Sequence, residues 1–146
     1  MKRAVQNFVK QNRTPGLVSH EIPLISNLNI VENVALIKQY HQNASRTEAH
    51  NIVFQYLKQL NLEHIARARN PHLSEEERFC GMLLRAAMVQ SGVLLIYKPF
   101  MLLPANKNAI FIYNILKNID DLYTQCFIFD FSWNKYLYGI NHVKKF

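Results

Sequence analysis

Apolar side chains recur every three or four residues through the middle of the chain, which predicts amphipathic helices. The first helix follows Asn29 and places Ile30, Val34 and Ile37 on one face. The second follows Ser45, and its apolar stripe comprises Ala49, Ile52, Val53, Tyr56, Leu57 and Leu60. The third follows Ser74, and its apolar face comprises Phe79, Met82, Leu83, Ala86 and Val89. The region from 29 to about 90 is therefore predicted to be mostly helical.

Each of these three helices begins with a capping-box sequence. The first residue of such a pair accepts a hydrogen bond from the backbone three positions on, and an acidic side chain at that position returns one. The pairs are Asn29 with Glu32, Ser45 with Glu48, and Ser74 with Glu77. These three helix starts are therefore the most sharply predicted local features.

The continuous apolar run 93–97 predicts a strand that is covered on both faces, and residues 125–131 predict a second buried strand. Residues 106–119 between them read as a helix, with Ile112, Ile115, Leu116 and Ile119 inward. A strand, a helix and a strand in this order predict a parallel pair joined by a crossover. Residues 16–19 are a short extended candidate, residues 2–11 fit a helix or a strand, and residues 61–68 fit one or two further helical turns.

Composition narrows the class of protein. With 146 residues, 49% of them hydrophobic and 18% charged, the chain is predicted to fold as one domain. The net charge of +7 is compatible with nucleic acid, anionic lipid or an acidic partner, but the basic residues are scattered, which favours a solvated surface. The six histidines include no pair at helical spacing, and Cys80 and Cys126 lack zinc-site spacing, so no metal or cofactor is predicted.

The order of motifs from residue 73 onward carries a family resemblance. Residues 73–78 read L-S-E-E-E-R. One helix length later comes the apolar run 93–96, which is followed by Tyr97, Lys98 and Pro99. This resembles the second half of an ATP-binding-cassette (ABC) transporter ATPase, where L-S-G-G-Q-R begins a helix that ends in A-R-A and precedes four apolar residues and D-E-P. The residues that keep this frame are Leu73, Ser74, Arg78, Leu83, Arg85, Ala86 and Pro99.

Upstream, residues 15–21 read P-G-L-V-S-H-E and are similar to the family's glutamine-loop segment, and N-I-V-E-N-V at 29–34 matches its N-L-T-V-x-E-N-V pattern. The resemblance runs from about Pro15 to about Ile140. It implies an α/β fold, a partial ABC-ATPase, with a mostly helical subdomain and a small parallel sheet. The single domain would comprise an N-terminal segment at 1–14, the glutamine-loop and helical part at 15–91, and a residual βαβ core with its tail at 92–146.

The resemblance also implies where functional residues would stand, and most are replaced here. The chain contains no G-x-x-x-x-G-K-[ST] phosphate loop. Tyr97 and Lys98 stand where the family has the two carboxylates that hold Mg²⁺ and polarise water, and neither ligates Mg²⁺. An alternative is that the ammonium of Lys98 replaces the lost metal charge beside a bound anion.

The signature region and three other positions depart in the same way. Ser74 remains, but Glu75 and Glu76 stand at the two glycines and Glu77 at the glutamine. Three carboxylates suit a helix N-terminus, but they repel a polyphosphate, because two like charges about 4 Å apart repel by roughly 4 kcal/mol. This cluster is predicted to be a capped helix start or a contact for a basic groove on a partner. The other replaced positions are His20 at the glutamine, Pro104 at a loop aspartate and Phe131 at the switch histidine.

Three functions from different classes follow. The first is a catalytically inactive ABC-ATPase-like protein, not an enzyme, acting as a structural or regulatory partner of a transporter at the cytoplasmic face of the inner membrane. Its partner would be a permease, a second ATPase subunit or a second copy. The second is a nucleotide-binding ATPase component completed by another chain, and the third is a basic nucleic-acid-binding domain, for which no strong motif is present. An exposed sheet edge further predicts that the chain dimerises, binds a partner or shields the edge with residues 1–14.

Overall fold

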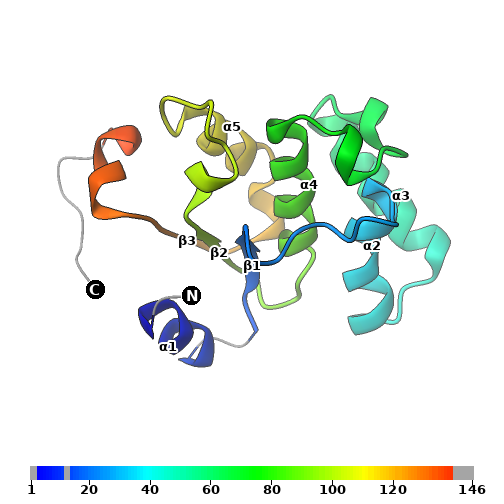
Figure 1. The fold of residues 1–146 in the computed structure, drawn as a ribbon. Coiled ribbons are helices and arrows are strands. Elements are labelled where there is room, and N and C mark those ends of the chain that lie inside the picture. The colour runs from blue at the N-terminus through cyan, green and yellow to red at the C-terminus, as the bar shows by residue number, and fades with distance from the viewer. Residues whose placement is uncertain (1–2, 12–13, 140–146) are drawn as a thin grey trace.

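The computed structural model describes residues 3–11 and 14–139, with helices packed around one small sheet (Figure 1). The helices are α1 (Arg3–Gln11), α2 (Ile30–His41), α3 (Arg46–Gln59), α4 (Glu75–Ala87) and α5 (Ile110–Asn118). The strands are β1 (Gly16–Ser19), β2 (Val93–Tyr97) and β3 (Gln125–Phe129). The predicted α/β fold with a mostly helical part and a small parallel sheet is confirmed, and the undecided segment near the N-terminus is helical over the residues described.

The sheet has the order β1-β2-β3, and both pairs of strands are parallel. In the strand register, Val18 of β1 lies opposite Ile96 of β2, and Ile96 lies opposite Ile128 of β3. The central strand is covered on both faces, because Leu94 and Ile96 lie in the main core while Leu95 and Tyr97 pack with Val5 of α1. The alternation follows from the two-residue period of a strand.

The three capping boxes are all present. In α4, the Ser74 hydroxyl accepts from the Glu77 amide at 3.1 Å, and a Glu77 carboxylate oxygen accepts from the Ser74 amide at 2.9 Å. The starts of α2 and α3 have the same arrangement. The chain before α2 is also fixed by a side-chain amide that the sequence did not predict. The buried Asn33 side chain accepts from the Ile25 amide at 2.8 Å and donates to three nearby carbonyls. These local bonds fix where the helical region begins.

Helix α4 connects the helical region to the sheet. It contacts α2 as well as β1 and β2, and Figure 1 shows it between the sheet and the pair α2–α3. Gly16 explains how closely β1 approaches it, since a Cβ there would lie 1.9 Å from the Ala86 carbonyl oxygen. In the connection between α4, whose C-cap is Met88, and β2, Gly92 has a left-handed φ of 67°.

Two element boundaries differ from the prediction. The last helix begins at Ile110, not at 106, because the Asn108 side chain accepts from the Ile110 amide and the chain before it forms turns. The last strand ends at Phe129, not at 131, because the Asp130 carboxylate accepts from the Phe131 amide at 2.7 Å and the backbone turns there. Short-range side-chain bonds outcompete the apolar pattern at both places.

The N-terminal helix covers a face of the sheet and not its edge. The Phe8 ring lies 4.7 Å from that of Phe127 and 5.6 Å from that of Phe129, measured between centroids. The prediction that this segment shields the open edge is therefore wrong for residues 3–11, because aromatic packing draws the helix over the face. Edge protection by dimerisation or by a partner stays a prediction.

Candidate functional site

Two groups of the residues singled out by sequence lie at one end of the molecule. A short connection, 88–92, joins the end of α4 to the start of β2. Helix α4 is therefore antiparallel to the strand that follows it. Its 13 residues span about 20 Å, and the five residues of β2 span about 16 Å. The N-terminus of α4 therefore returns to the level of the carboxyl ends of the strands, which is where ligands bind to open parallel sheets.

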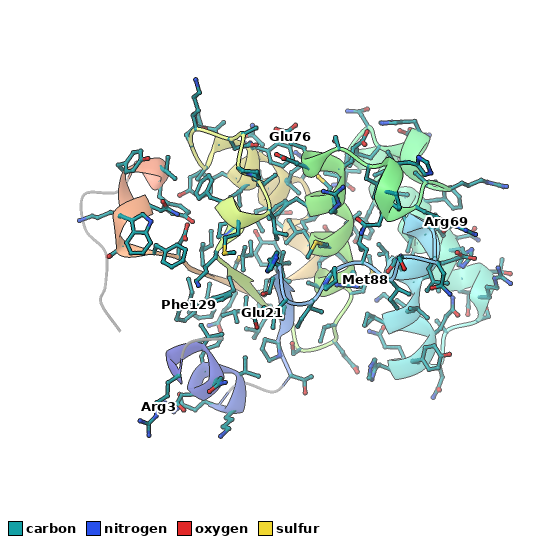
Figure 2. The ribbon with its side chains drawn as sticks, in the orientation of Figure 1. Arg3, Glu21, Arg69, Glu76, Met88 and Phe129 are labelled. Atoms are coloured by element: carbon teal, nitrogen blue, oxygen red, sulfur yellow. The ribbon has the colours of Figure 1, made fainter. Side chains whose placement is uncertain are left out.

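The α4 start is a capped, acidic helix end. Glu77 completes the capping box and also lies 2.9 Å from the Nε2 atom of His64. The bond from the Ser74 amide and then the contact with His64 lower the pKa of Glu77. Glu76, labelled in Figure 2, accepts from the Asn106 side-chain amide at 3.2 Å. This bond ties the helix start to the loop between β2 and α5, which also carries Pro104.

Lys98 leaves the end of β2 in a constrained conformation. Its φ of 50° is left-handed, which is unusual for a residue with a side chain and costs roughly 1–3 kcal/mol. Its amide donates to the Phe129 carbonyl at 2.7 Å, so β3 holds it there. Its Nζ lies 4.2 Å from the ring centroid of Phe131 and 4.9 Å from that of Tyr97, which are cation–π distances. The ammonium is thus placed against aromatic rings.

The segment after β3 forms a network that the sequence did not indicate. Asp130 accepts from the Tyr138 hydroxyl at 2.5 Å and from the Asn134 side chain at 3.1 Å. Burial, followed by the bond to Asp130, raises the pKa of Tyr138 well above its usual range. Phe131 stacks on Trp133 with centroids 4.3 Å apart. The spacing of Asp130 and Tyr138 matches no motif that could have revealed the bond.

The loop after β1 is held from α4. The Arg85 guanidinium donates to the carbonyls of Ile22 and Pro23 at 2.6 and 2.9 Å, and burial lowers its pKa. His20, the first residue after β1, is exposed. The sequence identifies Arg85 only as part of the resemblance and does not predict that it supports this loop.

The structure therefore sorts the predicted positions into two sets. The residues at the carboxyl ends of the strands are His20 after β1, Tyr97 at the end of β2, Lys98 just after it, and Phe131 after β3. The residues at the α4 start are Ser74, Glu75, Glu76 and Glu77, and Pro104 lies in the adjoining loop. Their correspondence to functional positions of a family stays a prediction, and so does the division of the chain into the three segments.

The two thiols are free and shielded. Burial raises the pKa of Cys80 to about 12 and that of Cys126 to about 11, so both remain protonated near neutral pH. Within residues 3–11 and 14–139, no cluster of three or more histidine, cysteine or acidic side chains could hold a metal ion. No helix in the same ranges has the length and apolar character needed to cross a membrane.

Comparison with known proteins places the fold. No protein-family model matches the chain, and no curated protein matches it. The solved structures that match include the dimeric, post-hydrolysis state of the ATP-binding cassette MJ0796 bound to ADP and Pi, and the dimeric structure of MJ0796 as a bacterial ABC transporter cassette. The first has 24% identity and a TM-score of 0.62 over 92% of this chain, and the second has 24% identity and a TM-score of 0.61 over 88%.

This likeness shows that the chain has part of the ATP-binding-cassette fold. The chain spans 59% of the length of the first structure and 57% of that of the second. The resemblance noted from the motifs at 15–34 and 73–99 is therefore confirmed at the level of the fold.

The same comparison corrects the expectation that the chain is not an enzyme. The cassettes that share its fold include one described in a post-hydrolysis state with ADP and Pi, so at least one protein with this fold hydrolyses ATP. The expectation was based on replaced side chains read one position at a time. The framework that brings a helix N-terminus beside the carboxyl ends of parallel strands is retained, and the replacements do not by themselves exclude activity.

Proposed function

We propose that the chain is a component of an ATP-binding-cassette assembly, working with a second cassette and with a phosphate-binding loop supplied by sequence other than these 146 residues. The assembly would serve a membrane transporter, with this component at the cytoplasmic face. The observation that carries the proposal is the fold shared with dimeric cassettes over 92% of this chain. The absence of a G-x-x-x-x-G-K-[ST] sequence from the 146 residues is the reason for placing the loop elsewhere.

The α4 start is the surface through which we propose that the chain pairs. Ser74 and Glu76 are exposed, Glu75 is half-buried, and this end of α4 is level with the strand ends. Neither Glu75 nor Glu76 is needed for the capping box, which uses Glu77. Their charges complement a basic groove on a partner, and such charge pairs give specificity and raise association rates.

The test is capture of the assembly with tagged chain, followed by measurement of phosphate release from MgATP by the captured material. We expect wild-type chain to bring down a second cassette and a magnesium-dependent ATPase activity. The double variant Glu75→Lys/Glu76→Lys should lose both, because it reverses the charge that faces the partner. A chain that is captured alone and releases no phosphate would refute the proposal.

A matched control separates pairing from general charge effects. Glu63 is an exposed acid in the short helical turn η1 (Glu63–Ile65), on another element. Glu63→Lys should keep both the partner and the phosphate release. Thermal melts of all three proteins check folding, and the double variant should melt a few degrees below wild type, because lysines replace acids that suit the helix N-terminus and the Glu76–Asn106 bond is lost while the capping box is intact.

A further inference from the structure

A pocket lies away from the strand ends, between the starts of α2 and α3. It is a pocket of about 220 Å³ whose lining residues are Asn29, Val31, Glu32, Arg46, His50, Phe54, Ala66 and Arg67. The base of the pocket consists of buried residues, since Val31 and Ala66 are only 3% and 4% exposed. The Val31 amide donates to the Ala66 carbonyl at 3.1 Å, which fixes α2 against the segment that carries Arg67.

Positive charge dominates this pocket. Arg46 and Arg67 are permanent cations, His50 adds an imidazole ring, and Glu32 is the one carboxylate among the lining residues. Glu32 is already engaged, because one of its oxygens accepts from the Asn29 amide at 2.9 Å and the other lies 3.9 Å from Arg46. Across the part of the chain that the structure describes, Arg67 makes no hydrogen bond or ion pair. Its guanidinium donors are therefore available to a ligand.

The α2 backbone does not supply this site. The amides of Ile30 and Val31 are bonded to the carbonyls of Ala68 and Ala66, and the Glu32 amide is bonded to the Asn29 side chain. On the α2 side, a ligand would therefore be held by side chains. Two guanidiniums present paired donors that match the two oxygens of a carboxylate or a phosphate.

The size of the pocket and its one aromatic wall limit the ligand further. Pockets for drug-sized ligands measure roughly 300–1,000 Å³, so a cavity of about 220 Å³ holds a smaller group and not a whole nucleotide. Phe54 is 41% exposed and lines the same cavity, which offers a ring or short apolar group a surface to pack on. From the cavity, its charge and this ring, we propose that it is a binding site for a small organic oxyanion, a carboxylate or a phosphate ester.

The test is a calorimetric titration of the full chain at low salt with benzoate, phenyl phosphate and inorganic phosphate. Arg67→Gln should weaken binding by about tenfold, since a hydrogen bond to a charged group is lost. Arg69→Gln is the matched control, because Arg69, labelled in Figure 2 on the side of α2 and α3, is exposed two positions away and does not line the pocket. It should bind like wild type.

A variant of opposite sign makes the test sharper. Glu32→Gln removes the negative charge from the pocket but keeps a side chain that can complete the capping box, so it should bind the oxyanion more tightly than wild type. Phe54→Ala should weaken phenyl phosphate and leave inorganic phosphate unchanged.

The outcomes separate the two sources of the oxyanion. Saturable binding of benzoate or phenyl phosphate that Arg67→Gln weakens supports the site, and the tighter probe tells whether the natural group is a carboxylate or a phosphate. Equal binding by Arg67→Gln and Arg69→Gln, or no saturable binding at low salt, overturns the proposal. Neither result depends on phosphate release from ATP, so this site and the proposed function stand or fall separately.

Discussion

The two faces of the sheet are covered in different ways. On one face, Leu94 and Ile96 belong to a core that continues through α4 and α5 into the helical region. On the other face, Leu95 and Tyr97 pack with Val5 in a small cluster with partly buried residues around it. The first face therefore ties the candidate site to most of the fold, while the second depends largely on one nine-residue helix. We infer that the second face opens locally at a lower free energy than global unfolding.

The comparison is tested most strongly by two adjacent residues of β2. Ile96 and Leu95 are both 0% exposed but point to opposite faces. Ile96→Ala should lower the free energy of unfolding by about 3–4 kcal/mol, whereas Leu95→Ala should cost about 2 kcal/mol, because α1 can move to close the cavity. Urea denaturation measures both, and the reverse order would show that the α1 face is the more rigid one.

Two partly buried aromatic residues sharpen the contrast. Phe8 packs on Phe127 and Phe129, and Phe111 packs beside Phe79 of α4 with centroids 6.2 Å apart. Phe8→Ala should cost about 1–2 kcal/mol and should speed amide exchange in α1 while leaving α4 protected. Phe111→Ala should instead speed exchange in α4. If Phe8→Ala exposed α4 to the same extent, the two faces would not be independent.

Substitutions of Ser74 test how much the capping box stabilises α4, the helix that packs on the first face of the sheet. Ser74→Ala removes the cap and should cost about 1 kcal/mol, while Ser74→Asn keeps a capping side chain and should be nearly neutral. The same pair informs on function, because Asn changes the exposed hydroxyl without loosening the helix. Thermal and urea melts of the two variants check the first part, and equal losses in both would contradict the capping geometry.

The smallest effect is the pH dependence of the same helix start. The pKa of Glu77 is lowered from 4.5 in the folded chain by the bond from Ser74 and the contact with His64. A lowered folded pKa contributes stability that is present above about pH 4.5 and is lost as the pH falls through the folded pKa. Glu77→Gln keeps the cap but removes this dependence. The stability difference between wild type and Glu77→Gln should therefore shrink between about pH 6 and pH 3, and a constant difference would contradict the assignment.

Sequence reasoning predicted what depends on local patterns. The starts of α2, α3 and α4 followed from three acid-bearing capping boxes, and β2 followed from an unbroken apolar run. The bond between Asp130 and Tyr138, and the support that Arg85 gives to the carbonyls of Ile22 and Pro23, were not predictable, because they join residues that become neighbours only after folding. The pocket between α2 and α3 was not predictable for the same reason.

The prediction that the chain is not an enzyme was wrong, because it depended on replacements such as Tyr97 and Lys98, and a replaced side chain does not remove the surrounding framework that the chain shares with an ATP-binding cassette. Lys98 illustrates the point, since its ammonium lies over the rings of Tyr97 and Phe131 at the sheet edge, an arrangement that no spacing rule describes.

The central claim is that this chain works within a paired ATP-binding-cassette assembly. The most direct test is the rate of phosphate release from MgATP by the captured assembly with wild-type chain, with Glu63→Lys and with Glu75→Lys/Glu76→Lys. The account predicts equal rates for the first two and loss of activity together with the partner cassette for the third. Phosphate release that is unchanged in the double variant, or absent from the wild-type assembly, would contradict it.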